Sequence, residues 1–293
     1  MPNYLKNKYP TTILDEKEIS AFKTHDDFNI IGIEILKEIA ILFTTVTGCI
    51  RVDSTGNEIP FNHEEAAIIG NMVRFCKLTS AFLEQFAKGR GETASIMFRC
   101  LAETYINLKF FLKFKDEHTL NHYIKHSLRQ ELNLLEIIKR NVADKEKMDD
   151  IEERMIASIK RSFRHSDFEE DKVNNSSKWD SKVKSRVKEI IGPDFYVLIY
   201  GLASHSIHGN WQDLISFHLK RKDEGFLPEF NWTLPTLQIV TAVTTMSCNL
   251  LKNYAEVALP KDEKREELFN VIDDILLRAL QLDSLHEAAI QRS

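Results

Sequence analysis

Two histidines, a serine and two tyrosines interrupt the apolar segment YVLIYGLASHSIHGNW, residues 196–211. On a helix with about 3.6 residues per turn, side chains four positions apart share one face. This spacing predicts a polar stripe with one further histidine beside it, and the residues are Tyr196, Tyr200, Ser204, His208 and His205. Imidazole exchanges protons near neutral pH and hydroxyl groups form hydrogen bonds, so the stripe has the groups for acid–base chemistry.

A second polar stripe lies within SIMFRCLAETYINLKFF, a segment that otherwise has the composition of a buried helix. Its members Arg99, Glu103 and Asn107 are spaced by four residues. Because an unpaired buried charge is strongly unfavourable, we expect the arginine and the glutamate to pair along the helix. The hydroxyls of the first stripe can donate to Glu103, and His205 or His208 can bond to its carboxylate. We therefore predict that the two stripes face each other across a polar pocket.

This predicted pocket combines an arginine for an anion, a carboxylate–histidine pair that can move protons, and hydroxyl groups. Such groups favour a phosphate-bearing ligand, for example a nucleotide or an RNA end. The expected ligand-binding residues are Arg99, Asn107, Tyr196, Tyr200 and Ser204. The expected catalytic residues are Glu103, His208 and His205. Two simpler interpretations stay open. The ion pair could only fix how the helices dock, and the two histidines could only stabilise the last turn of their helix, where the helix dipole favours cations.

Two other chemistries fit the sequence less well. Serine hydrolysis by Ser204, His208 and Glu103 lacks the strained turn and the oxyanion hole that expose a nucleophile, because the serine lies on a regular helix. A metal ion held by His205, His208 and Glu103 lacks further ligands, since the chain has neither a pair of Glu-x-x-His motifs nor a His-Glu-x-x-His motif. We expect no metal and no cofactor.

The two stripes together resemble a known pattern. An Arg-x-x-x-Glu element in an apolar helix, Trp179 in a polar lead-in and the segment YGLASHSIHGNW are similar to an uncharacterised bacterial helical family, a domain of unknown function. The resemblance covers about residues 90–220. The residues that match are Arg99, Glu103, Tyr200, Ser204, His205, His208 and Gly209. The resemblance implies a shared site and no established activity.

A helical ribonuclease is one alternative function. Toxins and antiviral proteins of the higher-eukaryote and prokaryote nucleotide-binding type carry an arginine, four to six residues and then a histidine. The nearest match is RSFRH, residues 161–165, which has only three residues between the two. Nearby basic residues could form a phosphate-binding face or a solvated helix face, and they are Lys160, Arg161, Arg164, Lys182, Lys184, Arg186 and Lys188.

A non-enzymatic interaction module is the other alternative, in which the polar stripes only specify the core. The protein would then form a homo-oligomer or bind a partner. The aromatic segments GFLPEFNW and NWQDL are the places where such a contact surface is expected.

The composition sets limits on partners and location. The formal net charge of −5 gives no overall attraction to nucleic acid or to an anionic membrane, so nucleic-acid binding needs a local basic patch. The four cysteines lie far apart without a Cys-x-x-Cys pair and are expected to be reduced and buried. We find neither the apolar run of a signal peptide nor a segment with the length of a membrane span, and we expect a cytoplasmic protein.

Long helices are expected to position these residues. Only 10 glycines and 7 prolines punctuate the 293 residues, and apolar residues recur every three or four positions. Helices are predicted at about 28–47, 62–88, 93–114, 117–142, 145–165, 180–191, 193–208, 235–258 and 261–289. The sequence therefore predicts a single all-α domain over residues 1–293, a bundle of about eight to ten helices with a buried central helix at about 93–114. The helices at 235–289 are expected to pack on the family-like core.

Overall fold

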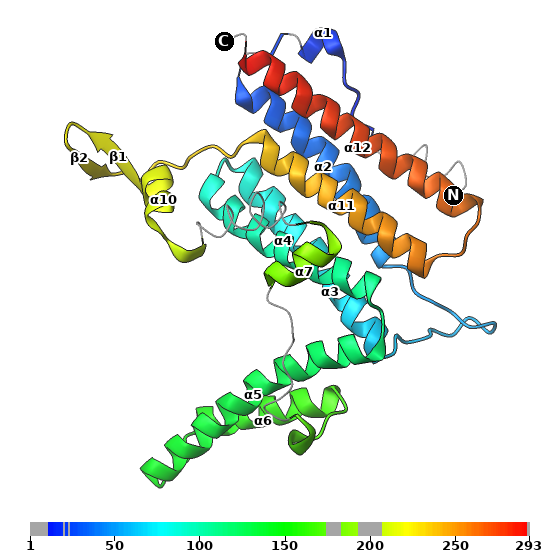
Figure 1. Ribbon diagram of the computed structural model, residues 1–293, viewed down its shortest axis with the longest axis vertical. Coiled ribbons are helices and arrows are strands. Elements are labelled where there is room, and N and C mark those ends of the chain that lie inside the picture. The colour runs from blue at the N-terminus through cyan, green and yellow to red at the C-terminus, as the bar shows by residue number, and fades with distance from the viewer. Residues whose placement is uncertain (1–10, 20, 23, 174–182, 193–206, 292–293) are drawn as a thin grey trace.

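Long helices account for most of the chain, as the spacing of its apolar residues predicts. The computed structural model describes residues 11–19, 21–22, 24–173, 183–192 and 207–291. The α-helices are α1 (Glu16–Ile19), α2 (His25–Thr47), α3 (His63–Ala87), α4 (Gly91–Lys113), α5 (Glu117–Lys145), α6 (Asp150–His165), α7 (Val183–Ile190), α10 (Trp211–Asp213), α11 (Leu237–Ala258) and α12 (Glu263–Ile290). Shorter elements are the 3-10 helix η1 (Glu170–Lys172), the π-helical turn η3 (Leu214–His218) and the strands β1 (Leu219–Lys222) and β2 (Gly225–Pro228). The predicted all-α, multi-helix fold is confirmed (Figure 1).

Helix α3 begins with a capping box, and the sequence carries its pattern in Asn62 and Glu65, three residues apart. Asn62 Oδ1 accepts from Glu65 N at 2.8 Å, while Asn62 N donates to Glu65 Oε2 at 3.1 Å, so two backbone donors are satisfied. The predicted break between α3 and α4 is present as well, because Gly89 adopts a φ of 67°. Gly91 then donates its amide to Thr233 O at 2.8 Å, and a Cβ at Gly91 would lie 2.5 Å from that oxygen. A glycine is therefore required where α4 begins.

The main hydrophobic core lies between α2, α3, α4, α11 and α12. Helix α11 packs against α2, α12 and α4, and α3 packs against α4 and α2 (Figure 1). Leu36, Leu101 and Leu250 are completely buried at these contacts. Helix α4 thus has α3 and α11 as neighbours, in agreement with its prediction as a central helix.

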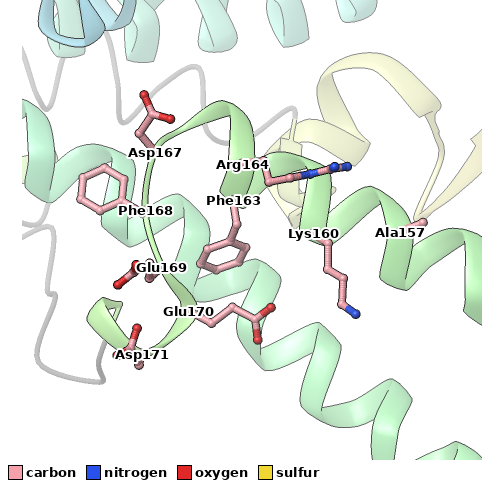
Figure 2. Close-up of a pocket in the computed structure, with 9 residues that line it drawn as sticks. All are labelled: Ala157, Lys160, Phe163, Arg164, Asp167, Phe168, Glu169, Glu170 and Asp171. Atoms are coloured by element: carbon pink, nitrogen blue, oxygen red, sulfur yellow. The ribbon is translucent and has the colours of Figure 1, made fainter.

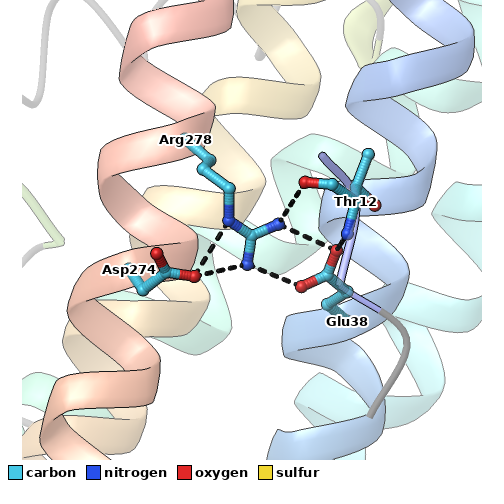
Figure 3. A network of polar contacts seen from close by, with 4 residues as sticks. All are labelled: Thr12, Glu38, Asp274 and Arg278. Carbon is cyan, nitrogen blue, oxygen red and sulfur yellow. Dashed lines mark hydrogen bonds and ion pairs between the residues drawn. The ribbon is translucent and has the colours of Figure 1, made fainter. Parts of the chain in front are cut away.

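A polar network fastens the N-terminal segment to α2 and α12 (Figure 3). Arg278 donates to the two oxygens of Glu38 at 2.9 and 2.7 Å and to Thr12 O at 3.1 Å. Glu38 Oε1 also accepts from Thr12 N at 2.6 Å. Burial disfavours the charged form of Glu38, but the donors of Arg278 and Thr12 overcome this effect and lower its pKa. The carboxylate therefore stays ionised inside the protein.

Helices α5 and α6 form a hairpin that extends from the main body and has a hydrophobic core of its own (Figure 1). That core consists of Leu128, Leu135, Ile138, Ile159, Phe163 and Val173. At the base of the hairpin, Tyr123 packs edge-on against Phe111 of α4, with ring centroids 4.9 Å apart. The charge-rich sequences of these helices predict a peripheral position, which the structure shows.

The two strands differ from the all-helical prediction, which assigns no regular element to residues 209–234 between the helices at 193–208 and 235–258. Part of this segment instead forms an antiparallel hairpin, in which Leu219 pairs with Pro228 and Lys222 with Gly225. Asp223 occupies the turn with a φ of 50°. The hairpin lies at the edge of the molecule (Figure 1).

The helix predicted at about 193–208 falls mostly on residues 193–206, which lie outside the described residues. Ile207 and His208 are helical, and Gly209 follows in a turn with a φ of 54°. A left-handed glycine is typical of a helix C-terminus, so the predicted end of this helix is present.

The cysteines agree only in part with their prediction. All four are free thiols, and Cys248 is buried. Cys49, in contrast, is exposed, because α2 ends at Thr47 and the chain leaves the core there.

Among the described residues, one helix has the length and composition of a membrane span, although no such segment is predicted from the sequence. Residues Glu65–Ala87 of α3 have a mean hydropathy of 1.2 in their most apolar window. Phe75 and Phe82 of this segment are buried in the main core. Core helices of soluble proteins meet the same criterion.

Candidate functional site

The candidate site lies on one face of α4 and begins with Arg99. The Arg99 side chain is only 8% exposed, and its Nη1 lies 2.9 Å from Glu103 Oε2, one helical turn later. Glu103 is 47% exposed, so its carboxylate reaches solvent while the guanidinium lies within the protein. The expected pairing along the helix is therefore present, and one of its two partners is open to solvent.

A second guanidinium, that of Arg74 on α3, touches the same helix. Arg74 Nε donates to Thr104 Oγ1 at 3.2 Å, and Thr104 Oγ1 donates in turn to Cys100 O at 2.8 Å. Thr104 directly follows Glu103 in the sequence, so Arg74 reaches α4 at the level of the ion pair. Arg74 is exposed, and its terminal nitrogens bond to none of the residues that the structure describes. The exposed Arg74 side chain is thus a second basic group beside the ion pair.

Asn107 is one helical turn beyond Glu103 and carries a buried acceptor. Its Oδ1 has no hydrogen-bond donor among the described residues. A buried polar atom without a partner costs free energy, which a water molecule or a ligand donor would recover. Asn107 therefore adds an acceptor to the side of α4 that carries Glu103.

Helix α7 brings a further buried arginine to α4. The two helices pack together, and Lys113 Nζ of α4 donates to Glu189 O near the end of α7 at 2.9 Å. Arg186 of α7 is only 3% exposed, whereas Lys184 and Lys188 on the same helix are exposed. The basic helix expected from the sequence thus buries one of its charges and leaves others in solvent.

Four predicted site residues, Tyr196, Tyr200, Ser204 and His205, lie outside the described residues. The predicted contact between the two polar stripes therefore stays a prediction. His208 is described and exposed, and no contact among the described residues joins it to the ion pair on α4.

A small cavity at the ends of α4, α7 and α11 was not foreseen from the sequence. Its volume is about 230 Å³, and it is lined by Lys109, Leu112, Lys113, Ile190, Asn253, Glu256 and Val257. Lys109 Nζ donates to Asn253 Oδ1. Burial lowers the pKa of Lys109, and the negative charge of Glu256 offsets this only in part. The available sequence signal is a pair of lysines, Lys109 and Lys113, four residues apart near the end of an apolar helix, where the helix dipole also favours cations.

A wider groove follows the end of α6 (Figure 2). It has a volume of about 980 Å³ and is lined by Ala157, Lys160, Phe163, Arg164, Asp167, Phe168, Glu169, Glu170 and Asp171. Figure 2 shows the basic residues on the helix and the acidic residues on the segment after it, so the groove has no single sign of charge. Arg161 and His165 of the RSFRH segment are exposed and do not line it. The groove therefore gives the ribonuclease alternative no specific support.

Metal-binding side chains do not gather in the part of the chain that the structure describes. No group of three or more histidine, cysteine, aspartate or glutamate side chains there could hold a metal ion. Glu103 and His208, two of the ligands considered from the sequence, are within this part and belong to no such group.

A protein-family comparison matches the helices that carry this site. The model described as Family of unknown function (DUF5677) matches residues 65–226, more than half of the chain. The match runs from the start of α3 into β2, and it includes Arg99, Glu103 and His208. No curated protein and no solved structure matches the chain. The chain therefore belongs to this family of unknown function, as its sequence resemblance predicts.

Proposed function

We propose that this member of the DUF5677 family binds a phosphate-bearing ligand, a nucleotide or an RNA end, on the face of α4 that carries Arg99. The observation that supports the proposal most is the asymmetry of the ion pair, in which a buried guanidinium bonds to a half-exposed carboxylate at 2.9 Å. An arginine is always charged and its planar group matches two phosphate oxygens. A buried arginine is also held in place, so little side-chain entropy is lost when an anion binds.

Neighbouring groups complement this role. Arg74 offers a second guanidinium at the level of the pair, and Asn107 offers a buried acceptor for a ligand hydroxyl or amine. Glu103 can move toward solvent when an anion approaches Arg99, because half of its side chain is already exposed. In a reaction, Glu103 is the group we expect to accept a proton, with His205 and His208 as the partners predicted from the sequence.

Titration calorimetry of the purified full-length protein tests the binding. The ligands are inorganic phosphate, AMP, ATP and a short RNA with a 5′-phosphate. We expect Arg99→Gln to weaken binding roughly tenfold or more, which corresponds to about 1.4 kcal/mol or more. The matched control is Arg51→Gln, because Arg51 also pairs with a carboxylate, that of Glu65 at 2.7 Å, but lies in the loop before α3. Circular dichroism checks that both variants fold.

Two results would contradict the proposal. One is a wild-type protein that binds none of these ligands at millimolar concentration. The other is an equal loss of affinity in the Arg99 and Arg51 variants, since that would reflect net charge and not a site. RNA recovered intact from these titrations, without added metal, would also count against the ribonuclease alternative.

A further inference from the structure

Large apolar side chains are exposed on the β1–β2 hairpin and on the segments that flank it. They are Trp211, Phe226, Leu227, Phe230, Trp232 and Leu234. Phe230 is 89% exposed, and Trp211 and Trp232 are 57% and 53% exposed. Exposure of several large aromatic rings within one short segment is energetically unfavourable for an isolated protein. Such a cluster is typical of a surface that contacts a partner or ligand.

Basic groups accompany the rings. The strand register places Arg221 opposite Phe226, and the guanidinium carbon lies 5.2 Å from the ring centroid. Trp211 packs edge-on against the same ring at 5.4 Å. Arg90, at the start of α4, lies 5.3 Å from the ring centroid of Trp232. Arginine and aromatic side chains are thus interleaved on this surface.

The charge of the hairpin is balanced. The exposed bases Lys220, Arg221 and Lys222 of β1 are accompanied by the acids Asp223, Glu224 and Glu229. A surface of this kind does not attract polyanions from a distance. A ligand that fits it must gain most of its affinity from stacking on the rings, with a few phosphate contacts in addition.

We infer that this surface, from Trp211 through the hairpin to Trp232, binds single-stranded nucleic acid. Every base has a flat face that stacks on an exposed aromatic ring, and single-stranded nucleic acids bind proteins through such rings together with nearby basic groups. Unpaired bases meet this requirement, whereas the bases of a duplex are already stacked on each other.

The surface also connects with the proposed phosphate site. Thr233 O accepts from Gly91 N at 2.8 Å, so the segment that carries Trp232 is fixed to the first residue of α4. Arg99 follows eight residues later on that helix, which corresponds to about 12 Å along its axis. Two nucleotides of an extended strand cover such a distance, so one strand can stack on the rings and place a phosphate at Arg99. The inference in this form rests on the proposed function.

The experiment measures fluorescence anisotropy of a labelled single-stranded RNA of twelve nucleotides with the full-length protein. The variant is Phe230→Ser combined with Trp232→Ser, and the matched control is Leu277→Ser, an exposed apolar residue of α12. We expect the double variant to weaken RNA binding roughly tenfold or more and the control to bind as the wild type does. Because few phosphates are contacted, the slope of log affinity against log salt should be about −2, at about −0.7 per neutralised phosphate.

Mononucleotide binding separates this inference from the proposed function. The hairpin variant should bind AMP as the wild type does, whereas Arg99→Gln should weaken AMP binding roughly tenfold or more and leave the stacking contribution to RNA binding in place. If AMP does not bind and Arg99→Gln leaves the RNA affinity unchanged, while the RNA still binds through the hairpin, the proposed function is wrong and the assignment of the hairpin surface stands. Unchanged RNA affinity in the hairpin variant overturns the inference. The inference is also overturned if the wild type does not bind RNA but binds anionic lipid vesicles, or forms a dimer, through the hairpin.

Discussion

At the scale of residues, two of the arginine–glutamate pairs among the described residues lie in very different surroundings. Arg99 pairs with the half-exposed Glu103, whereas Arg278 pairs with Glu38, whose side chain is only 2% exposed (Figure 3). An exposed carboxylate is already well solvated, so its bond to arginine adds little stability. A buried carboxylate must keep its partners, because its removal leaves a buried charge behind.

We therefore predict that Glu103→Gln lowers the free energy of unfolding by less than about 1 kcal/mol. Glu38→Gln, in contrast, should lower it by about 3 kcal/mol or more, because Arg278 and Thr12 lose a charged acceptor. Urea denaturation at pH 7 measures both values. Equal losses in the two variants would mean that the pair on α4 is a structural one, and would remove the main support for a ligand site there.

The residue spacing was sufficient to predict the pair on α4 but not its exposure. Positions four apart on a helix must lie on one face, so the Arg99–Glu103 bond follows from local geometry. Whether that face is covered depends on which helices pack against α4, and this is a tertiary property. The Arg74 bond to Thr104 could not be predicted for the same reason, since it joins residues thirty positions apart.

At the scale of elements, two histidines join the start of α2 to the end of α12. His25 Nδ1 lies 2.9 Å from His286 Nε2, and His286 Nδ1 lies 3.3 Å from Gln238 Nε2 of α11. An imidazole that accepts at Nδ1 carries its single proton at Nε2, so a neutral His286 satisfies both contacts. A protonated ring would place a second donor against the Gln238 amide. The contact therefore requires the neutral ring.

We predict that this junction makes the protein less stable as the pH falls from 7.5 to 5.5. Burial lowers the pKa of His286 and the neighbouring His25 lowers it further, against the opposing charges of Glu287 and Asp283. The unfolded chain then takes up the proton first. The contribution of His286 is complete above its unfolded pKa of about 6.5 and is lost as the pH falls toward the lower pKa of the folded state.

Thermal melting of the wild type and of His286→Gln over this pH range measures the effect. The wild type should lose more stability with acid than the variant does. The control is His165→Gln at the exposed end of α6, which should keep the pH dependence of the wild type. An unchanged pH dependence in His286→Gln would show that the junction does not titrate in this range.

Element prediction succeeded for helices and failed for the strands for a physical reason. A helix such as α3 buries one face, so its apolar residues recur with the helical period, and Asn62 and Gly89 mark its ends. The strand β1 has the sequence LKRK, and three of its four residues are exposed. A strand that buries neither face has no alternation of apolar and polar residues, and Gly225 alone is too weak a signal for a turn.

At the scale of the whole molecule, the described residues contain two separate hydrophobic cores. The larger one joins α2, α3, α4, α11 and α12, and the smaller one lies between α5 and α6. The sequence predicts one domain over the entire chain. Small cores bury less apolar surface per ordered residue, so the α5–α6 hairpin should be the part that opens most easily within that domain.

Truncation of the buried ring in Phe163→Ala should destabilise the small core by about 3 kcal/mol or more. We predict that this change speeds amide hydrogen exchange in α5 and α6 and leaves exchange in α11 unchanged. Phe75→Ala is the matched control, because Phe75 is buried in the larger core and stacks on Phe43 with ring centroids 5.2 Å apart. It should speed exchange in α11 and leave exchange in α5 and α6 nearly unchanged, because the hairpin already opens on its own at a lower free energy. If Phe163→Ala speeds exchange in α11 as much as in α6, the two cores open together and the hairpin is not a separate unit of stability.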